Sequence, residues 1–488
     1  MTAHQGLTTV HRPRGSDRGY GVGSNPVLWR GVWPLAVVVV GTLTGYLAVQ
    51  RPALLALAVA ALAVTLVGFR RPDLVLLAMV PMSVAHVSFG YGGDPVAAVV
   101  VTGAVGVCLL VAVPMRPEPL RPRVDWTLLC VVAFGVLLVA STTVRSTVGS
   151  PVLAGKFGGL SHLVIVVAGL LLLVATIWTA PDPAAVARLT ALAGGIIATH
   201  ALLNGSYNLG RLEGLGLNSN YLAAVLAPTV GVGIGLTRQS RRPYWLVPAA
   251  LCLVAVQQTQ SRGGMLAAVA GMGVALLAAR PTGQRLVGAA LVAGAGGLAY
   301  AYRGLLWALV FGSRPADQLG DSSGRTEVAR AALDAILQHP FTGIGYRMFP
   351  YYALGHPEVG RYLYTHDDYL GLAAEAGLPA ALIFLTLVVG GLTASGGLRL
   401  TAVRAGVAAG AVNLVFANIL VCPVAIVGFW IGLGCLLAHG RHRRLRPGRP
   451  SGAPSSSAPG AVPSARVVGQ QPGPADAGAH RRTVAVTR

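Results

Sequence analysis

The amino-acid sequence predicts an all-α polytopic membrane protein, with about 12 to 14 transmembrane helices and one large extracytoplasmic loop that contains an amphipathic helix. The first observation is composition: of the 488 residues, 54% are hydrophobic and 11% charged, and the mean hydropathy is +0.65. Soluble domains do not have such values. The second is that apolar runs of about 20 residues, the length that spans a bilayer, fill nearly everything between Leu28 and Ala438. The third is that arginine recurs in alternate breaks between these runs.

The apolar runs give about fourteen expected spans, and these divide the chain into five parts. The approximate bounds of the spans are 31–50, 52–69, 72–90, 95–115, 124–141, 159–179, 185–204, 220–237, 243–258, 262–279, 285–302, 369–391, 403–420 and 423–438. We predict a disordered cytoplasmic N-terminus at 1–27, a bundle of about eleven spans at 28–302, an extracytoplasmic loop at 303–365 and about three further spans at 366–438. The tail at 439–488 is rich in proline, serine and arginine and is expected to be disordered in the cytoplasm.

Arginines set the expected orientation, because positively charged loops stay on the cytoplasmic side. The alternate loops that carry them contain Arg70, Arg71, Arg116, Arg121, Arg123, Arg238, Arg241, Arg242, Arg280, Arg285, Arg399 and Arg404. These loops share a side with both termini, which are also rich in arginine. The sequence therefore predicts a multi-pass protein of the cytoplasmic membrane with both termini in the cytoplasm.

The segment 303–365 is the one long loop on the opposite, outer side, and long loops between spans commonly hold water-side sites. An apolar stripe at helical spacing predicts an amphipathic helix over residues 325–338. The stripe consists of Val328, Ala332, Ala335 and Ile336. We expect Ser323 to cap the start of this helix and His339-Pro340 to end it.

Composition also excludes some functions. The net charge of +21 comes from arginines in loops that flank spans, without interleaved exposed aromatics, so no nucleic-acid partner is expected. All five cysteines lie within apolar runs and show no metal-ligand spacing, so packing roles are expected. Side chains of the adjacent Asp367 and Asp368 would point about 100° apart on a helix. We therefore expect no metal and no cofactor.

Polar residues on the expected outer side are the candidates for chemistry, since arginine and histidine near lipid are costly without a partner. Arg211 precedes the eighth span, and Arg262 begins the tenth after a polar run at 257–261. Both depart from the positive-inside pattern. The alternative for each is a side chain that reaches from the helix end to the membrane surface without a further role. The polar run makes Arg262 the better candidate for binding.

Arg325 and His366 are the other two candidates. Arg325 begins the loop helix, and a guanidinium at a helix N-terminus suits phosphate oxygens, although a solvated helix-end arginine is the alternative. His366 stands at the mouth of the twelfth span, where Asp367 or Asp368 would orient or charge its imidazole. The alternative is an interfacial histidine with a packing role, which is also our interpretation of His200.

Together these residues predict glycosyl transfer from a lipid diphosphate. Arginines neutralise a diphosphate leaving group in place of a metal, and a histidine with a pKa near 6.5 takes a proton from the attacking hydroxyl. The expected partners are a lipid-linked glycan donor, an acceptor hydroxyl and membrane lipid.

Four ordered motifs between residues 205 and 390 resemble the O-antigen ligase and polymerase family. The motifs are GLNSNYLAAVLAP at 216–228, TQSRGGMLAAVAG at 259–271, RTEVARAALDAILQHPFTGIGYRMF at 325–349 and THDDYLGLAAEAGLPAALIF at 365–384. They resemble, in order, the family's Pro-Asn-x-x-Ala span, its Ser-Arg-Gly helix start, its Arg-initiated loop helix ending in His-Pro…Gly-x-Gly, and its His-Asn-x-x-Leu…Glu-x-Gly signature.

The resemblance implies metal-independent, inverting transfer from an undecaprenyl-diphosphate-linked donor, in a GT-C-like helical bundle. It implies that His366 is the catalytic base and that Arg262 and Arg325 bind the diphosphate. Two departures stand out. Asp367 replaces the usual asparagine and is expected to raise the pKa of His366, and Leu217 stands where the family has proline before Asn218. The second departure indicates a divergent donor site.

Ligases and polymerases of this family share these motifs, so the sequence leaves both open, with a peptidoglycan polymerase as a third enzyme. The alternative from another class is a transporter or flippase for a lipid-linked glycan. Such a protein should carry charged residues near the bilayer midplane and show related halves. The expected spans are nearly free of charge and the motifs are not repeated, which favours the enzyme.

Overall fold

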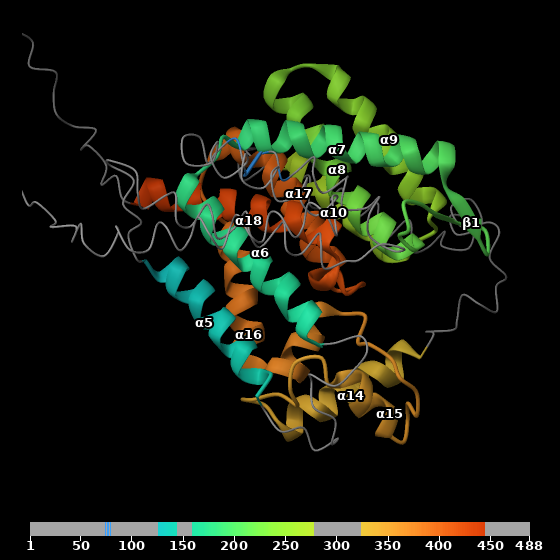
Figure 1. Cartoon of the computed structure of the whole chain (residues 1–488). Helices are drawn as coiled ribbons and strands as arrows, with labels where there is room; N and C mark the ends of the chain where they lie inside the picture. Colours follow the sequence, from blue (N-terminus) through green and yellow to red (C-terminus); the bar gives the residue numbers. More distant parts are fainter. Residues whose placement is uncertain are drawn as a thin grey trace, which may run out of the picture. The chain divides into compact units, whose positions relative to one another are not determined.

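The computed structural model describes residues 125–143, 159–277 and 324–444, together with positions 74, 76, 77 and 79. The expected spans at 31–50, 52–69, 95–115 and 285–302, most of the span at 72–90, the N-terminal segment at 1–27 and the tail from 445 onward lie outside the described residues. Residues 439–444, which were expected to belong to the disordered tail, are instead the helical end of α18. Almost all described elements are helices (Figure 1). The α-helices are α5 (Trp126–Ser141), α6 (Gly159–Thr179), α7 (Pro183–Asn204), α8 (Ser219–Ser240), α9 (Leu246–Gln258), α10 (Arg262–Leu277), α14 (Arg325–Gln338), α15 (Phe349–Gly355), α16 (Asp368–Leu392), α17 (Thr401–Asn413) and α18 (Pro423–Arg444).

Short elements connect these helices. The 3₁₀ turns are η1 (Pro243–Trp245), η2 (Gly397–Leu400) and η3 (Ile419–Val421), and the antiparallel strands β1 (Ser206–Asn208) and β2 (Arg211–Glu213) form a hairpin between α7 and α8. Side-chain caps begin several helices where the sequence changes from polar to apolar. Asp125 accepts from Leu128 N at the start of α5, and Asn218 accepts from the backbone N–H groups of Asn220 and Tyr221 at the start of α8.

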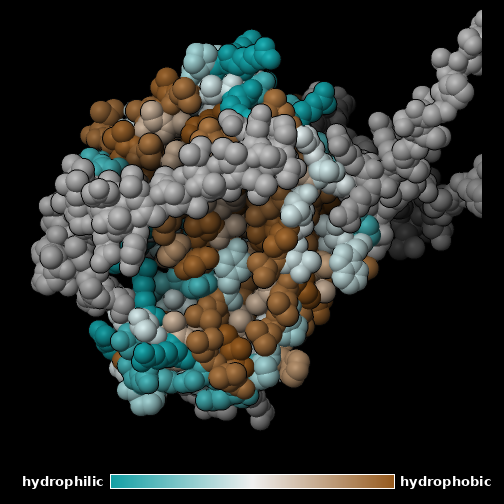
Figure 2. Space-filling model, turned by 180° about the vertical axis from the view of Figure 1, so that it is seen from behind, coloured by the Kyte–Doolittle hydropathy of each residue, from teal (hydrophilic) through white to brown (hydrophobic). Residues whose placement is uncertain are grey.

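Among the described residues, three helices are long and apolar enough to cross a membrane: Pro183–Asn204, Ser219–Ser240 and Asp368–Leu392. Shorter apolar helices accompany them at Trp126–Ser141, Ile165–Thr179, Pro243–Gln258, Arg262–Leu277 and Val424–Gly440. Hydrophobic residues make up most of the middle of the face seen in Figure 2, and hydrophilic residues gather toward its upper and lower edges. The fold is therefore that of a helical membrane protein, as the composition predicted.

Small residues let α8, α10 and α17 approach closely. A Cβ on Gly231 would lie 2.8 Å from the carbonyl carbon of Gly271, and a Cβ on Gly235 would lie 2.6 Å from Cα of Ala402. Such contacts replace hydrophobic burial as the packing force between helices in lipid.

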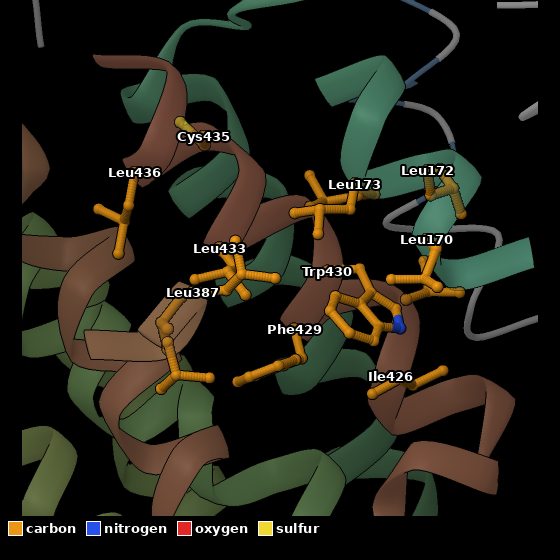
Figure 3. Packing of buried hydrophobic residues seen from close by; sticks show 14 of the residues in the cluster. Leu170, Leu172, Leu173, Leu387, Ile426, Phe429, Trp430, Leu433, Cys435 and Leu436 are labelled. Carbon is orange, nitrogen blue, oxygen red and sulfur yellow. The ribbon is translucent and has the colours of Figure 1, made fainter. Parts of the chain in front are cut away.

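A second packed region surrounds α18. Trp430 is fully buried and lies beside Leu170 and Leu173 of α6 (Figure 3). Phe429 lies on the side of α18 that faces Leu387 of α16. The indole fits because α6 has a glycine opposite: a Cβ on Gly169 would lie 2.1 Å from Nε1 of Trp430. This region holds α6, α16 and α18 together.

The helices have two distinct ends. At one end, α14 and α15 lie beside the start of α16 (Figure 1), and we call this the loop end. At the other end, Arg238 of α8 donates to the carbonyls of Ala275 and Leu276 at the end of α10, and Gln239 donates to Leu398 O at 2.7 Å. The arginine-bearing turns expected in the cytoplasm thus meet at the end away from the loop helices.

Two expectations differ from the structure. The expected span 403–420 is helical only to Asn413, because the following turn supplies groups to α16: Leu414 O accepts from Asp368 N at 2.7 Å and Leu420 N donates to the Asp368 carboxyl at 3.0 Å. The N-cap position of α14 is Gly324 rather than Ser323, since the backbone enters the helix at φ +75°. The helix itself covers Arg325–Gln338, as predicted, and its expected apolar stripe is buried.

Candidate functional site

A kink in α16 organises the loop end. Gly377 has φ 86° and ψ 162°, and Pro379 has no N–H, so the carbonyls of Ala374 and Glu375 lose their partners within the helix. The loop after α14 replaces those partners. Ile344 N donates to Ala374 O at 2.9 Å and Gly345 N to Glu375 O at 3.0 Å, while Leu378 N donates to Pro340 O at 2.8 Å. The loop is therefore attached to the kink by backbone hydrogen bonds.

Glycines are required for this close contact. A Cβ on Gly377 would lie 2.3 Å from the carbonyl oxygen of Phe341, and a Cβ on Gly343 would lie 2.3 Å from the carbonyl carbon of Glu375. Both glycines have positive φ, which side-chain-bearing residues seldom adopt. The Gly-x-Gly and Glu-x-Gly parts of the sequence motifs are the two sides of this one joint.

His366 lies immediately before α16, with φ +52°. A histidine in this left-handed conformation is uncommon, and such backbone strain often accompanies functional sites. The turn around it is fixed on both sides: Thr365 Oγ1 donates to Asp367 O at 2.9 Å, and Asp367 caps α16 by accepting from Leu370 N at 3.0 Å. His366 itself is exposed at the surface.

Arg325 and His366 lie close together. The pKa of His366 is lowered, first because surrounding groups remove part of its water and second because the positive charge of Arg325 disfavours the imidazolium. The start of α14 also lies near the segment that leads to His366, since a Cβ on Gly324 would lie 3.5 Å from Nη2 of Arg361. A neutral imidazole beside a guanidinium is suited to accept a proton next to an anion.

The two aspartates after His366 have structural partners. Asp367 caps α16, and Asp368 is buried and accepts from Leu420 N and Ile419 N. The expectation that Asp367 raises the pKa of His366 is therefore wrong: the carboxylate serves the helix cap. The pKa is lowered instead, first because surrounding groups remove part of the water around the imidazole and second because Arg325 is positively charged.

Arg211 and Arg262 lie at the neighbouring turns of the loop end. Arg211 is half-buried in β2, where its Nε donates to Thr259 O at 3.1 Å and its Nη2 to Asn220 Oδ1 at 2.8 Å. It thus joins the hairpin, the turn before α10 and the start of α8. Arg262 is exposed as the first residue of α10, in a turn where Ser261 Oγ accepts from Gly264 N at 3.3 Å.

Contacts between these turns connect them to the His366 region. A Cβ on Gly263 would lie 2.3 Å from Cβ of Phe416, in the same turn after α17 that binds Asp368. Tyr221, in the first turn of α8, is close enough to raise the pKa of Arg347 in the loop after α14. The four motifs found in the sequence therefore form one continuous region at the loop end.

Arg347 and Glu375 were not predicted from the sequence. Glu375 is buried in α16 and accepts from the backbone N–H groups of Arg347 and Phe349, the latter at 3.2 Å. Arg347 has φ +64°, and its guanidinium carbon lies 4.4 Å from the ring centroid of Tyr364. Burial acts to lower the pKa of Arg347, but Glu375 and nearby tyrosines outweigh it and the pKa is raised. A carboxyl within an otherwise apolar span was the available signal.

Within the three described ranges, no group of three or more histidine, cysteine, aspartate or glutamate side chains is placed to hold a metal ion. The charged groups that the site offers to a substrate are its arginines.

The fold and this region define a helical membrane protein whose loop helices are attached to the start of one span. Residues 247–385 match the family model described as O-antigen ligase, which covers α9, α10, α14, α15 and most of α16. The resemblance to the O-antigen ligase and polymerase family is confirmed, and the matched segment carries Arg262, Arg325 and His366. The chain has no match among curated proteins.

Proposed function

We propose that the protein transfers or polymerises glycan from an undecaprenyl-diphosphate-linked donor to an acceptor hydroxyl, at the outer face of the cytoplasmic membrane, during surface polysaccharide biosynthesis. The observation that carries the proposal is the position of His366, where loss of surrounding water and then the positive charge of Arg325 lower the pKa of the imidazole. The family match supports ligase or polymerase activity in general. The separation of the arginine-bearing turns from the loop end supports an outer location for the site, with both termini in the cytoplasm.

In the proposed step, neutral His366 accepts the proton of the acceptor hydroxyl as its oxygen attacks the anomeric carbon. The new glycosidic bond forms while the bond to the diphosphate oxygen breaks, and the diphosphate leaves with the electron pair. Inversion follows from attack on the face opposite the leaving group. The low pKa of His366 keeps the base neutral near neutral pH.

The arginines neutralise the departing diphosphate. Arg325 and Arg262 are exposed at helix N-termini, where backbone N–H groups also favour anions. Arg211 contributes charge from a fixed position, since its Nε and Nη2 are hydrogen-bonded. We propose that these guanidinium groups take the place of a metal ion and that no cofactor takes part.

The test is complementation of a deletion strain, in which surface polysaccharide and lipid-linked glycan are extracted and sized on gels. His366→Ala and Arg325→Ala are expected to reduce transfer on the order of 100-fold or more, because each removes a group that acts on charge developing in the transition state. Short lipid-linked units should accumulate outside the membrane. The length of the residual ladder separates polymerase from ligase.

Two matched controls accompany these variants. Arg330→Ala removes an arginine from the same helix, where Arg330 pairs with Glu358 at 3.6 Å and both side chains are largely exposed. His200→Ala removes an exposed histidine of α7. Both should behave as wild type. If His366→Ala and Arg325→Ala also behave as wild type, or if lipid-linked units accumulate on the cytoplasmic side of the membrane, a transporter becomes the better explanation.

A further inference from the structure

A small polar cavity lies at the start of α16, between the loop after α14 and the turn after α17, and takes no part in the proposed diphosphate site. It has a volume of about 30 Å³ and is lined mainly by polar side chains, those of Arg347, Tyr364, Thr365, Asp368, Glu375 and Asn418. Thr365, which precedes His366 in the chain, is one of its lining residues. The arginines proposed to bind the diphosphate, Arg211, Arg262 and Arg325, are not among its lining residues.

Arg347 is held in this cavity by its backbone and by Tyr364. Glu375 fixes the backbone by accepting its N–H, and the Tyr364 ring lies 4.4 Å from the guanidinium carbon. Within the described part of the chain, the guanidinium makes this ring contact and no hydrogen bond or ion pair. Its planar set of N–H donors is therefore presented to the cavity without a protein acceptor.

The lining is suited to a hydroxyl group. Arg347 supplies donors, whereas Asp368 and Glu375 supply carboxyl oxygens that accept, and a hydroxyl both donates and accepts. The volume is that of one small polar group, since a cavity needs roughly 10–15 Å³ to hold a single water molecule. A diphosphate is too large for it and would meet two carboxyl groups.

Tyrosines continue from the cavity to the surface. Tyr364 contacts Tyr362 edge to face at 5.8 Å between ring centroids, and Tyr362 contacts Tyr351 in the same way at 5.3 Å. Tyr362 is 45% exposed. Aromatic rings with polar tips provide an apolar face for the C–H side of a sugar ring and a hydrogen-bonding edge for its hydroxyls. The run of three tyrosines is thus long enough to support a saccharide whose substituent enters the cavity.

We propose that this cavity is the acceptor subsite and that the acceptor is a saccharide: one hydroxyl-bearing substituent of the sugar binds Arg347 and the cavity carboxyl groups while its ring packs on Tyr362 and Tyr364. The inference rests on the proposed function, in which His366 deprotonates an acceptor hydroxyl, and adds the chemical class of that acceptor. It also separates the site into a donor side formed by the helix-end arginines and an acceptor side formed by Arg347 and the tyrosines.

The test is binding of methyl glycosides of glucose, galactose and mannose to the purified full chain in detergent, measured by saturation-transfer NMR. Arg347→Gln removes the charge and most donors. Gly371→Ala narrows the cavity from the other side, since its Cβ would lie 2.9 Å from Thr365 Oγ1, and alanine favours the helix. Each variant is expected to weaken binding of the preferred glycoside roughly tenfold, the effect of losing a charge-assisted hydrogen bond. Arg330→Gln, on the exposed face of α14, is the matched control and should bind as wild type.

Each outcome decides for or against the subsite. Binding of the preferred glycoside that is weakened roughly tenfold or more in both variants, with unchanged thermal unfolding, supports it. Three results would overturn it. The first is wild-type binding by both variants, and the second is no signal from any glycoside with the wild-type chain. The third is displacement of the glycoside by inorganic pyrophosphate only when Arg347 is present. His366→Ala separates this inference from the proposed function: if it binds glycoside but loses transfer, both stand, and if it retains transfer, the function fails while the binding result still decides the subsite.

Discussion

Replacing Gly377 with alanine tests whether the kink of α16 holds the loop after α14. The residue has φ 86° and ψ 162°, a region that costs a side-chain-bearing residue about 1–3 kcal/mol. The new Cβ would lie 2.3 Å from the Phe341 carbonyl oxygen, so the loop must move away. Movement breaks the three backbone hydrogen bonds of the joint, each with a net value of about 0.5–1.5 kcal/mol. The sum is about 2.5–7.5 kcal/mol.

A loss of this size opens the loop locally, and the first 3 kcal/mol alone raise the open fraction by roughly 100-fold. The assay is limited trypsin digestion of the detergent-solubilised protein. Trypsin cleaves after arginine, and Arg347 follows the loop at 340–345 while Arg361 lies between that loop and His366. The cleavage rate is read by gel and mass spectrometry. Transfer activity should fall with it, since His366 follows this segment.

Gly390→Ala is the matched control for this prediction. It lies in the same helix, but its Cβ would meet Leu437 Cδ2 at 3.7 Å, an ordinary contact. Alanine is the better helix former, so this variant should be cleaved no faster than wild type. Equal cleavage rates for Gly377→Ala and Gly390→Ala would refute the role assigned to the kink.

Three further predictions follow from the site. Arg325→Gln should raise the pKa of His366, because a positive neighbour is removed. Since the base must be neutral, the acid limb of the residual pH–rate profile should then move to higher pH. An acid limb that stays in place would contradict the effect of Arg325 on His366. Glu375→Ala leaves two buried N–H donors without their acceptor and should lower the free energy of unfolding by about 2–5 kcal/mol, whereas Glu375→Gln keeps one oxygen and should lower it less. Unfolding in detergent ranks the two variants, and equal losses would count against the role of Glu375 as the acceptor of these N–H groups. Arg211→Lys cannot make both hydrogen bonds of the guanidinium, so the β1–β2 hairpin should be cleaved faster by protease, and unchanged protection would argue against the anchor.

Local sequence signals predicted most of the described helices. The loop helix at Arg325–Gln338 was predicted from the periodicity of its apolar stripe, and its burial agrees. The span at Gly159–Thr179 was predicted from an apolar run of membrane-spanning length. In both cases the information lies within the segment itself, so neighbouring elements were not needed.

The sequence did not predict the role of Arg347 or Glu375, because their roles depend on long-range backbone pairing. Only when the segment at 340–345 is hydrogen-bonded to the kink of α16 does Glu375 reach the N–H of Arg347. The early end of α17 at Asn413 has the same origin, since the carboxyl group that binds the following turn belongs to Asp368. Apolar composition continues through that turn, and composition alone therefore extended the helix to 420.

Asp368 and Glu375 explain how one helix start can align both sides of the proposed site. They lie seven positions apart, which is about two turns or 10 Å, and therefore face the same side of α16. Each carboxyl accepts backbone N–H groups from a different segment: Asp368 from the turn at Ile419–Val421, and Glu375 from the loop that carries Arg347. Buried carboxyl groups near a membrane are costly unless they are hydrogen-bonded, and these bonds offset the cost. Because His366 is connected to the same helix through the Asp367 cap, the proposed base and the proposed acceptor cavity share one rigid support, and a change in the start of α16 is expected to affect both.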